Sequence, residues 1–333
     1  MNNFPVEKIE IQIQNILVCL FLIASFVFVV LCGPVSAGNQ MQVKGTGFSS
    51  PQEAVKALVK AARQANREDM LKILGNDAQD IIFSGDEVES KGELENFAQS
   101  ADKKYKIETI TPTSAQLKIG DDDWVFPIPI VKIDEKWYFD EAAGRDEMLN
   151  RRIGSNELSV IQVMLAYVNA QLEYASQDRD GDGVLEYAQK IKSDPGKKNG
   201  LYWPVAAGEK ESPFGPFIAQ AEREGYTAGA DKSEESKPYN GYYYKLITRQ
   251  GKNASGGAYD YIVNGNMILG FGMLAYPAKY GVSGIMTFVV NQAGVVYESD
   301  LGEKTADIIN QTVKYNPDDH IWHKVDKQYL ESD

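Results

Sequence analysis

The sequence predicts an α+β protein, because two stretches of helical periodicity are each followed by segments that alternate apolar and polar residues. Apolar residues recur at helical spacing over residues 54–62 and again over residues 158–175. Period-two segments follow over residues 105–139 and 241–298. Helices that precede antiparallel strands, rather than alternating with them, are typical of this class. We therefore expect helices on an antiparallel sheet, then a long helix packed on a second antiparallel sheet.

The first half begins with a well-marked helix. Ser50 has the residue type of an N-cap, Pro51 suits the first helical position, and Glu53 completes a capping box. A strand meander should follow over residues 105–139, with a turn at Asp134-Glu135. Between the first helix and the meander, further helices are expected over residues 67–74, 77–83 and 91–102.

Two helices are expected in the middle of the chain. One should continue from Glu141 to Gly154, and a second should be capped by Asn156 and run to about residue 177. The new capped helix suggests a boundary between separate cores. Strands are then expected over residues 241–248, 267–276, 285–290 and 295–298, with a last helix over 305–313. The predicted division is a leader over residues 1–37, one domain over 45–145 and another over 155–333.

Three aspartates alternate with other residues after the long helix, in Asp178-Arg-Asp180-Gly-Asp182-Gly183. Carboxylates at the first, third and fifth positions of a loop, followed by glycine, supply oxygen ligands around Ca²⁺. The twelfth position of such a loop is a bidentate glutamate, but here it is Gln189. Either Glu186 closes the shell, or the site is weaker and partly hydrated; the alternative to a metal site is a polar acidic turn. The predicted metal ligands are Asp178, Asp180, Asp182, Glu186 and the backbone carbonyl of Val184.

The N-terminus has the features of an export signal. Residues 15–32 carry no charge and are rich in Leu, Ile, Val and Phe, and Val35-Ser-Ala37 offers small residues for cleavage before Gly38. Cleavage would remove both cysteines, Cys19 and Cys32, and leave a mature chain without a thiol. The apolar run is long for a signal, so the alternative is a single N-terminal membrane anchor. We expect a periplasmic or extracellular protein.

The composition narrows the class of partner. The net charge of −13 disfavours nucleic acid and anionic lipid, because both attract basic surfaces. No second apolar stretch long enough to span a membrane follows residue 37. We therefore expect an envelope protein or a glycan as partner, no nucleic acid, and no membrane contact once the leader is cleaved.

Few residues offer catalytic chemistry. His320 and His323 are the two histidines, and a zinc site would need a third ligand. Because Pro317 precedes them and they lie near the C-terminus, we expect them in a loose tail. Residues 281–284 are not a nucleophile elbow, because the second glycine comes one residue too early. The tyrosines at 242–244, with Tyr202-Trp203, could form an aromatic binding surface or could be packed inside. A pair of carboxylates could cleave glycosides, but the sequence alone does not single out a pair.

Five segments occur in an order that resembles a known family. Together they look like the bacterial domain-of-unknown-function family 2950, over nearly all of the mature chain. The resemblance implies a secreted or envelope protein and implies no established activity. The segments are Phe48-Ser-Ser-Pro-Gln-Glu-Ala54, Phe126-Pro-Ile-Pro-Ile130, Asn156-Glu-Leu-Ser-Val-Ile-Gln162, residues 178–183 and Tyr276-Pro-Ala-Lys-Tyr-Gly-Val-Ser-Gly284.

Each half also resembles a known fold. Residues 48–140 resemble the cone-shaped nuclear-transport-factor-2-like fold. The long helix, the Gly-Tyr-Tyr-Tyr strand and residues 275–296 look like the globular head of type IV pilin-like proteins. A pilin helix opens its mature chain, whereas this helix is internal, so we do not expect polymerisation into a pilus. We expect a non-catalytic binding or structural role with one Ca²⁺; the alternative is a hydrolase acting on envelope polymers through carboxylates.

Overall fold

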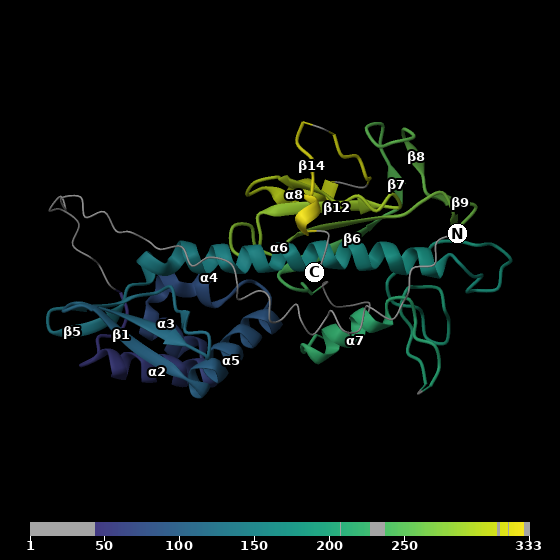
Figure 1. Cartoon of the computed structure of the whole chain (residues 1–333). Helices are drawn as coiled ribbons and strands as arrows, with labels where there is room; N and C mark the ends of the chain where they lie inside the picture. Colours follow the sequence, from purple (N-terminus) through teal and green to yellow (C-terminus); the bar gives the residue numbers. More distant parts are fainter. Residues whose placement is uncertain (1–43, 207, 227–236, 312–313, 319, 330–333) are drawn as a thin grey trace. The chain divides into compact units, whose positions relative to one another are not determined.

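The computed structural model describes residues 44–206, 208–226, 237–311, 314–318 and 320–329 (Figure 1). The expected leader over residues 1–37, its cysteines and the expected mature start at Gly38 lie outside these residues. Val43–Val325 forms one compact unit. Across the described residues, no helix is both long enough and apolar enough to cross a membrane.

The first sheet is an antiparallel meander of short strands. Its order is β1-β2-β4-β5, and β3 also pairs with β2. Asp134 and Glu135 join β4 to β5 with φ angles of 46° and 67°, which confirms the predicted two-residue turn. The strands are β1 (Tyr105–Thr111), β2 (Ser114–Ile119), β3 (Trp124–Val125), β4 (Ile130–Ile133) and β5 (Lys136–Phe139).

Helices pack on this sheet and share its core. The Ser50 hydroxyl oxygen accepts a hydrogen bond from the backbone N–H of Glu53 at 3.2 Å, which confirms the predicted N-cap. The Glu53 carboxylate returns to the backbone N–H of Ser49, one residue earlier than a capping box requires. Leu58 and Leu117 are fully buried where helix and sheet meet. The helices are α2 (Pro51–Arg63), α3 (Arg67–Leu74), η2 (Asn76–Ala78), α4 (Gln79–Ile82) and α5 (Glu87–Lys103).

The middle of the chain forms one helix where two were expected. α6 (Glu141–Tyr174) runs for 34 residues, so the prediction of one helix ending at Gly154 and another capped by Asn156 is wrong. A Cβ atom at Gly154 would meet nothing within 4 Å, so packing does not require a glycine here. The low helix propensity of glycine weakens α6 at this position by about 1 kcal/mol. The Asn156 side chain donates instead to the backbone carbonyl of Ser283 at 3.0 Å, an acceptor that local sequence does not reveal.

The second sheet is antiparallel, in the order β14-β13-β12-β11-β6. α6 packs on β11 and β12, and Tyr167 of this helix donates a hydrogen bond to the carbonyl of Gly272 at 3.2 Å. The opposite face carries a separate core that includes Leu274, Val289 and Ile309. The remaining elements are β6 (Tyr242–Ile247), β11 (Gly272–Pro277), β12 (Met286–Asn291), β13 (Tyr297–Asp300), β14 (His323–Lys324), the paired strands β7 (Arg249–Gln250) with β8 (Tyr259–Asp260) and β9 (Ile262–Val263) with β10 (Asn266–Met267), α7 (Gly215–Arg223), α8 (Thr305–Gln311) and η3 (Lys327–Tyr329).

The predicted α+β class with antiparallel sheets is confirmed. The expectation of a loose tail is wrong for His323, which lies in β14 opposite Glu298 of β13. The division into domains over 45–145 and 155–333 stays a prediction, since α6 continues through the expected boundary.

Candidate metal centre

The aspartate-rich loop begins where α6 ends. The Arg179 guanidinium donates hydrogen bonds to the backbone carbonyls of Glu173 and Tyr174, at 3.1 and 3.3 Å, and lies 5.7 Å from the ring centroid of Trp203. A positive charge is favourable at a helix C-terminus, so the basic side chain of the loop is directed back toward the helix. The aspartates on either side of it therefore receive no cation from their own loop.

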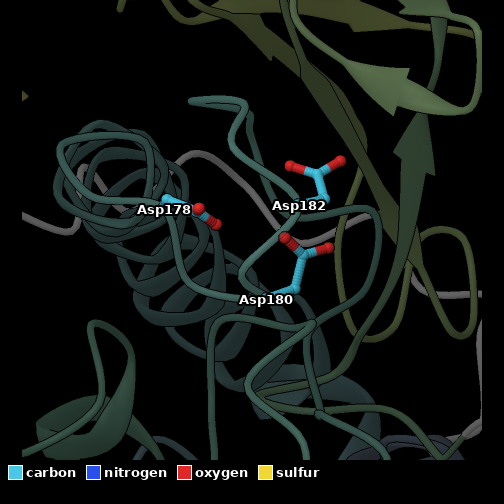
Figure 2. Close-up of side chains that lie close together, drawn as sticks. All are labelled: Asp178, Asp180 and Asp182. Atoms are coloured by element: carbon cyan, nitrogen blue, oxygen red, sulfur yellow. The ribbon is translucent and has the colours of Figure 1, made fainter.

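Three carboxylates come together in this loop. Oxygens of Asp178, Asp180 and Asp182 all lie within 4.8 Å of one another, and all three residues are exposed (Figure 2). Asp178 accepts hydrogen bonds from the backbone N–H groups of Gly181 and Gly183, at 2.7 and 2.9 Å. These glycines have φ angles of 82° and 87°, which L side chains rarely adopt. The loop therefore curls back on its first aspartate and holds the next two close to it.

The charges of these carboxylates act on one another. The N–H groups of Gly181 and Gly183 lower the pKa of Asp178 below its usual value. Burial raises the pKa of Glu186, and the charges of Asp180 and Asp182 raise it further, so Glu186 lies in the field of the aspartates. In the described part of the chain, no lysine or arginine forms an ion pair with the three aspartates. Like charges at this separation repel unless a cation lies between them.

A hairpin distant in sequence packs against the loop. The Asn266 amide donates to the Asp182 carboxylate at 2.7 Å, and the backbone N–H of Met267 donates to Glu186 at 3.1 Å. The backbone N–H of Tyr187 donates to the Met267 carbonyl at 2.8 Å. An asparagine amide oxygen is a hard ligand, so Asn266 could join a cation shell after rotation of its side chain. The sequence analysis did not find Asn266, because nothing local indicates where this hairpin docks.

The predicted ligands make different contacts in the structure. The three aspartates are brought together, whereas Glu186 is not part of their cluster and has one oxygen bonded to the hairpin. The Val184 N–H donates to Asp182 at 2.8 Å and so stabilises the turn. The Gln189 amide donates to the carbonyl of Gly265 at 2.6 Å and is thus bonded to the hairpin. Water would have to complete a Ca²⁺ shell of about six to eight oxygens.

The family comparison covers the loop and both sheets. Residues 45–325 match the family described as Protein of unknown function (DUF2950). The chain belongs to the DUF2950 family. No curated protein and no solved structure matches this DUF2950 chain.

Several other candidate groups of the DUF2950 protein have structural roles. The buried Ser283 hydroxyl accepts from the backbone N–H of Lys279 at 3.0 Å and closes a turn. Tyr242 is fully buried and donates to the carbonyl of Met286 at 3.0 Å. Tyr243 packs against Tyr276, with ring centroids 5.5 Å apart. The tyrosine strand is therefore a packed element and not an open aromatic surface.

Outside the loop, Glu157 and Glu298 act on each other through their charges. Glu157 of α6 accepts hydrogen bonds from the backbone N–H groups of Ile285 and Met286, both at 2.9 Å. Burial raises the pKa of Glu298 on β13, the charge of Glu157 raises it further, and His323 lowers it. Glu157 thus holds the start of β12, and the pKa of Glu298 lies above its usual value. Sequence reasoning could not choose this pair, because its members come from two elements that meet only by packing.

Proposed function

We propose that this DUF2950 chain is a non-catalytic exported protein whose binding or structural role in the cell envelope depends on one Ca²⁺ held by residues 178–183. The observation that carries the proposal is the approach of the Asp178, Asp180 and Asp182 carboxylates to within 4.8 Å, without an ion pair to a described lysine or arginine. Carboxylate oxygens on a flexible loop suit Ca²⁺ better than softer metals.

The expected affinity fits an exported protein. The loop lacks a bidentate glutamate at its twelfth position, and Gln189 is bonded to the neighbouring hairpin. A site of this kind should bind with a dissociation constant on the order of 10⁻⁴ to 10⁻³ M, which suits extracellular calcium. The partner we propose is an envelope protein or a glycan, and the pilin-like and nuclear-transport-factor-2-like resemblances are part of the same proposal.

Calcium binding can be tested by thermal unfolding. A ligand that binds only the folded state stabilises it by about 2.7 kcal/mol at a hundredfold excess over its dissociation constant. Millimolar Ca²⁺ should raise the Tm of the wild type, and Mg²⁺ should raise it much less because it demands a tighter octahedral shell. Asp180→Ala should remove the response and leave the apo protein folded, since it also removes repulsion. Asp121→Ala, in another exposed acidic turn, should respond like the wild type. Identical wild-type melting in Ca²⁺ and in chelator would refute the site.

Export can be tested separately. N-terminal sequencing of the protein recovered from the periplasm or medium should begin at Gly38, because the small residues at 35–37 precede it. A product that keeps residues 1–37 would instead support the single N-terminal anchor.

A carboxylate-dependent hydrolase is the second candidate, and the Glu157–Glu298 pair favours it. Two carboxyls whose charges act on each other could serve as an acid and a base. Against it, Glu157 already accepts two backbone hydrogen bonds. Release of soluble fragments from purified cell-wall polymer by the wild type, and not by Glu298→Gln, would favour the hydrolase over the binding role.

A further inference from the structure

The face of the second sheet opposite α6 carries a cavity of about 490 Å³. Its lining residues lie between Arg249 and Trp322 in the sequence, so the aspartate loop is not part of it. A volume of this size lies in the range of small-molecule sites, roughly 300 to 1,000 Å³. α8 covers only part of this face: Ile309 is buried, whereas Ile308 is 41% exposed and Ile321 is 51% exposed. The apolar side chains that line the cavity are Val289, Leu301, Ile308, Ile309, Ile321 and Trp322.

Parts of the cavity wall are hydrogen-bonded to neighbouring strands. The backbone N–H of Tyr315 donates to the carbonyl of Arg249 at 2.9 Å, and the N–H of Gly251 donates to the carbonyl of Tyr315 at 2.8 Å. The Lys245 ammonium donates to the carbonyl of Ile309 at 3.2 Å and so fastens the end of α8. These hydrogen bonds hold Tyr315 and the end of α8 against residues of β7 and β6.

Two cations line the same cavity as the apolar side chains. The Arg249 guanidinium lies 3.4 Å from Asp260 in an exposed pair, a kind that contributes little and leaves Arg249 able to bind another anion. Among the described residues, Lys314 forms no ion pair. The lining carboxylate, Asp318, accepts hydrogen bonds from the backbone N–H groups of His320 and Ile321, at 3.0 and 3.2 Å. The Asp318 carboxylate is therefore hydrogen-bonded within its own turn.

We propose that this cavity binds a single-chain fatty acid. The alkyl chain would lie on the apolar floor beside Val289 and Trp322, and the carboxylate would pair with Lys314 and Arg249 at the edge. An apolar floor with cations at one side complements an amphiphile that has one anionic head, and neither a sugar nor a neutral lipid matches both parts. This site does not depend on the proposed Ca²⁺ loop.

The test is displacement of dansyl-labelled undecanoic acid from the purified protein, followed by energy transfer from tryptophan to the dansyl group. Octanoate, decanoate and dodecanoate should compete with rising affinity, by about fourfold for each added methylene until the cavity is full. Decanol should bind at least roughly tenfold more weakly than decanoate, because it lacks the charge-assisted contact. Trp322→Phe should lower the energy transfer, since only the three other tryptophans of the chain remain as donors, and keep the binding measured by dansyl emission.

Matched variants separate a site from surface adsorption. Lys314→Glu should weaken decanoate binding by roughly tenfold or more, and Ile308→Asp should weaken it similarly. Lys304→Glu, an exposed lysine just before α8 that does not line the cavity, should leave the affinity within about twofold. The proposal is overturned by unsaturable binding, by an affinity independent of chain length, by equal binding of decanol, or by equal effects of Lys304→Glu and Lys314→Glu. The measurement is made in Ca²⁺ and in chelator, so loss of the calcium response does not affect its outcome.

Discussion

Glu89, in the first turn of α5, has one buried carboxylate oxygen without a hydrogen-bond partner among the described residues. Burial raises the pKa of Glu89 to about 7, and the charge of Glu93 adds to this rise. The nearby polar side chains of Ser84 and Asn156 and the charge of Arg152 act in the opposite direction but do not overcome burial. The Arg152 guanidinium is already paired with Glu93 at 3.0 Å.

The raised pKa of Glu89 predicts that the stability of the folded protein depends on pH. The pKa of Glu89 is raised on folding from 4.5 to about 7, so the folded state binds the extra proton between these values. The free energy of unfolding should therefore fall as pH rises from about 4.5 to 7, by about 3 kcal/mol in total. Glu89→Gln should remove this part of the pH dependence. At pH 8 the variant should be more stable than the wild type. Glu87→Gln, an exposed neighbour in the same turn, is the control. Urea unfolding across this range measures the effect, and parallel profiles for wild type and Glu89→Gln would contradict it.

At the scale of the element, α6 serves both halves of the molecule. Its Arg152 side chain is 5% exposed and donates to the backbone carbonyls of Asp80, at 2.7 Å, and Ile81. These are carbonyls at the end of α4, where a helix leaves acceptors without partners inside the helix. Further along α6, Glu157 bonds to the start of β12. The helix thus satisfies polar groups in both halves.

Removal of Arg152 should therefore be costly. Arg152→Met keeps the length of the apolar stem but leaves two carbonyls and Glu93 without the guanidinium, and we expect a loss of about 3 kcal/mol or more. Arg151→Met at the preceding position removes an exposed pair with Glu147, a 3.4 Å hydrogen bond to the Val125 carbonyl and a contact with the Trp124 ring, and should cost less, about 1 kcal/mol. Chemical denaturation of the two variants measures the difference. Similar values for both would mean that the buried contacts of Arg152 contribute nothing beyond packing.

For the whole molecule, the first core contains buried residues drawn only from the span Ala54 to Phe139. A fragment of residues 45–145 would therefore contain every buried residue of this core but would lack Arg152 and Met148, which packs against the core. It would also lose contacts of Asp86, which accepts hydrogen bonds from the Tyr226 hydroxyl at 2.9 Å and the Gly241 N–H at 3.2 Å. The buried core residues favour independent folding of such a fragment, whereas the lost polar contacts should lower its stability.

We expect residues 45–145 to unfold cooperatively, and residues 45–154 to be more stable because the longer fragment restores Arg152 to its carbonyl acceptors. Thermal unfolding of both fragments, with Arg152→Met in the longer one as control, measures the contribution. A molten or insoluble longer fragment would show that the halves share one core and would refute the predicted domain boundary.

Local sequence was sufficient for the elements whose causes are local. Ser50 and Pro51 begin α2, Asp134-Glu135 turns β4 into β5, and the spacing of three aspartates with Gly183 locates the candidate loop. Each depends on backbone preferences and hydrogen bonds that span only a few residues. The family assignment likewise followed from ordered segments of sequence.

Only the tertiary structure decided which distant groups meet. Asn266 docks on Asp182, Arg152 reaches Asp80, and Asn156 bonds to Ser283 in the interior of a helix that it was expected to begin. Burial of Glu89 likewise depends on packing. These outcomes depend on which faces pack together, because a polar group removed from water requires a partner wherever packing supplies one. Helical propensity alone favoured a break near Gly154, and long-range packing on both halves overrides so small a local preference.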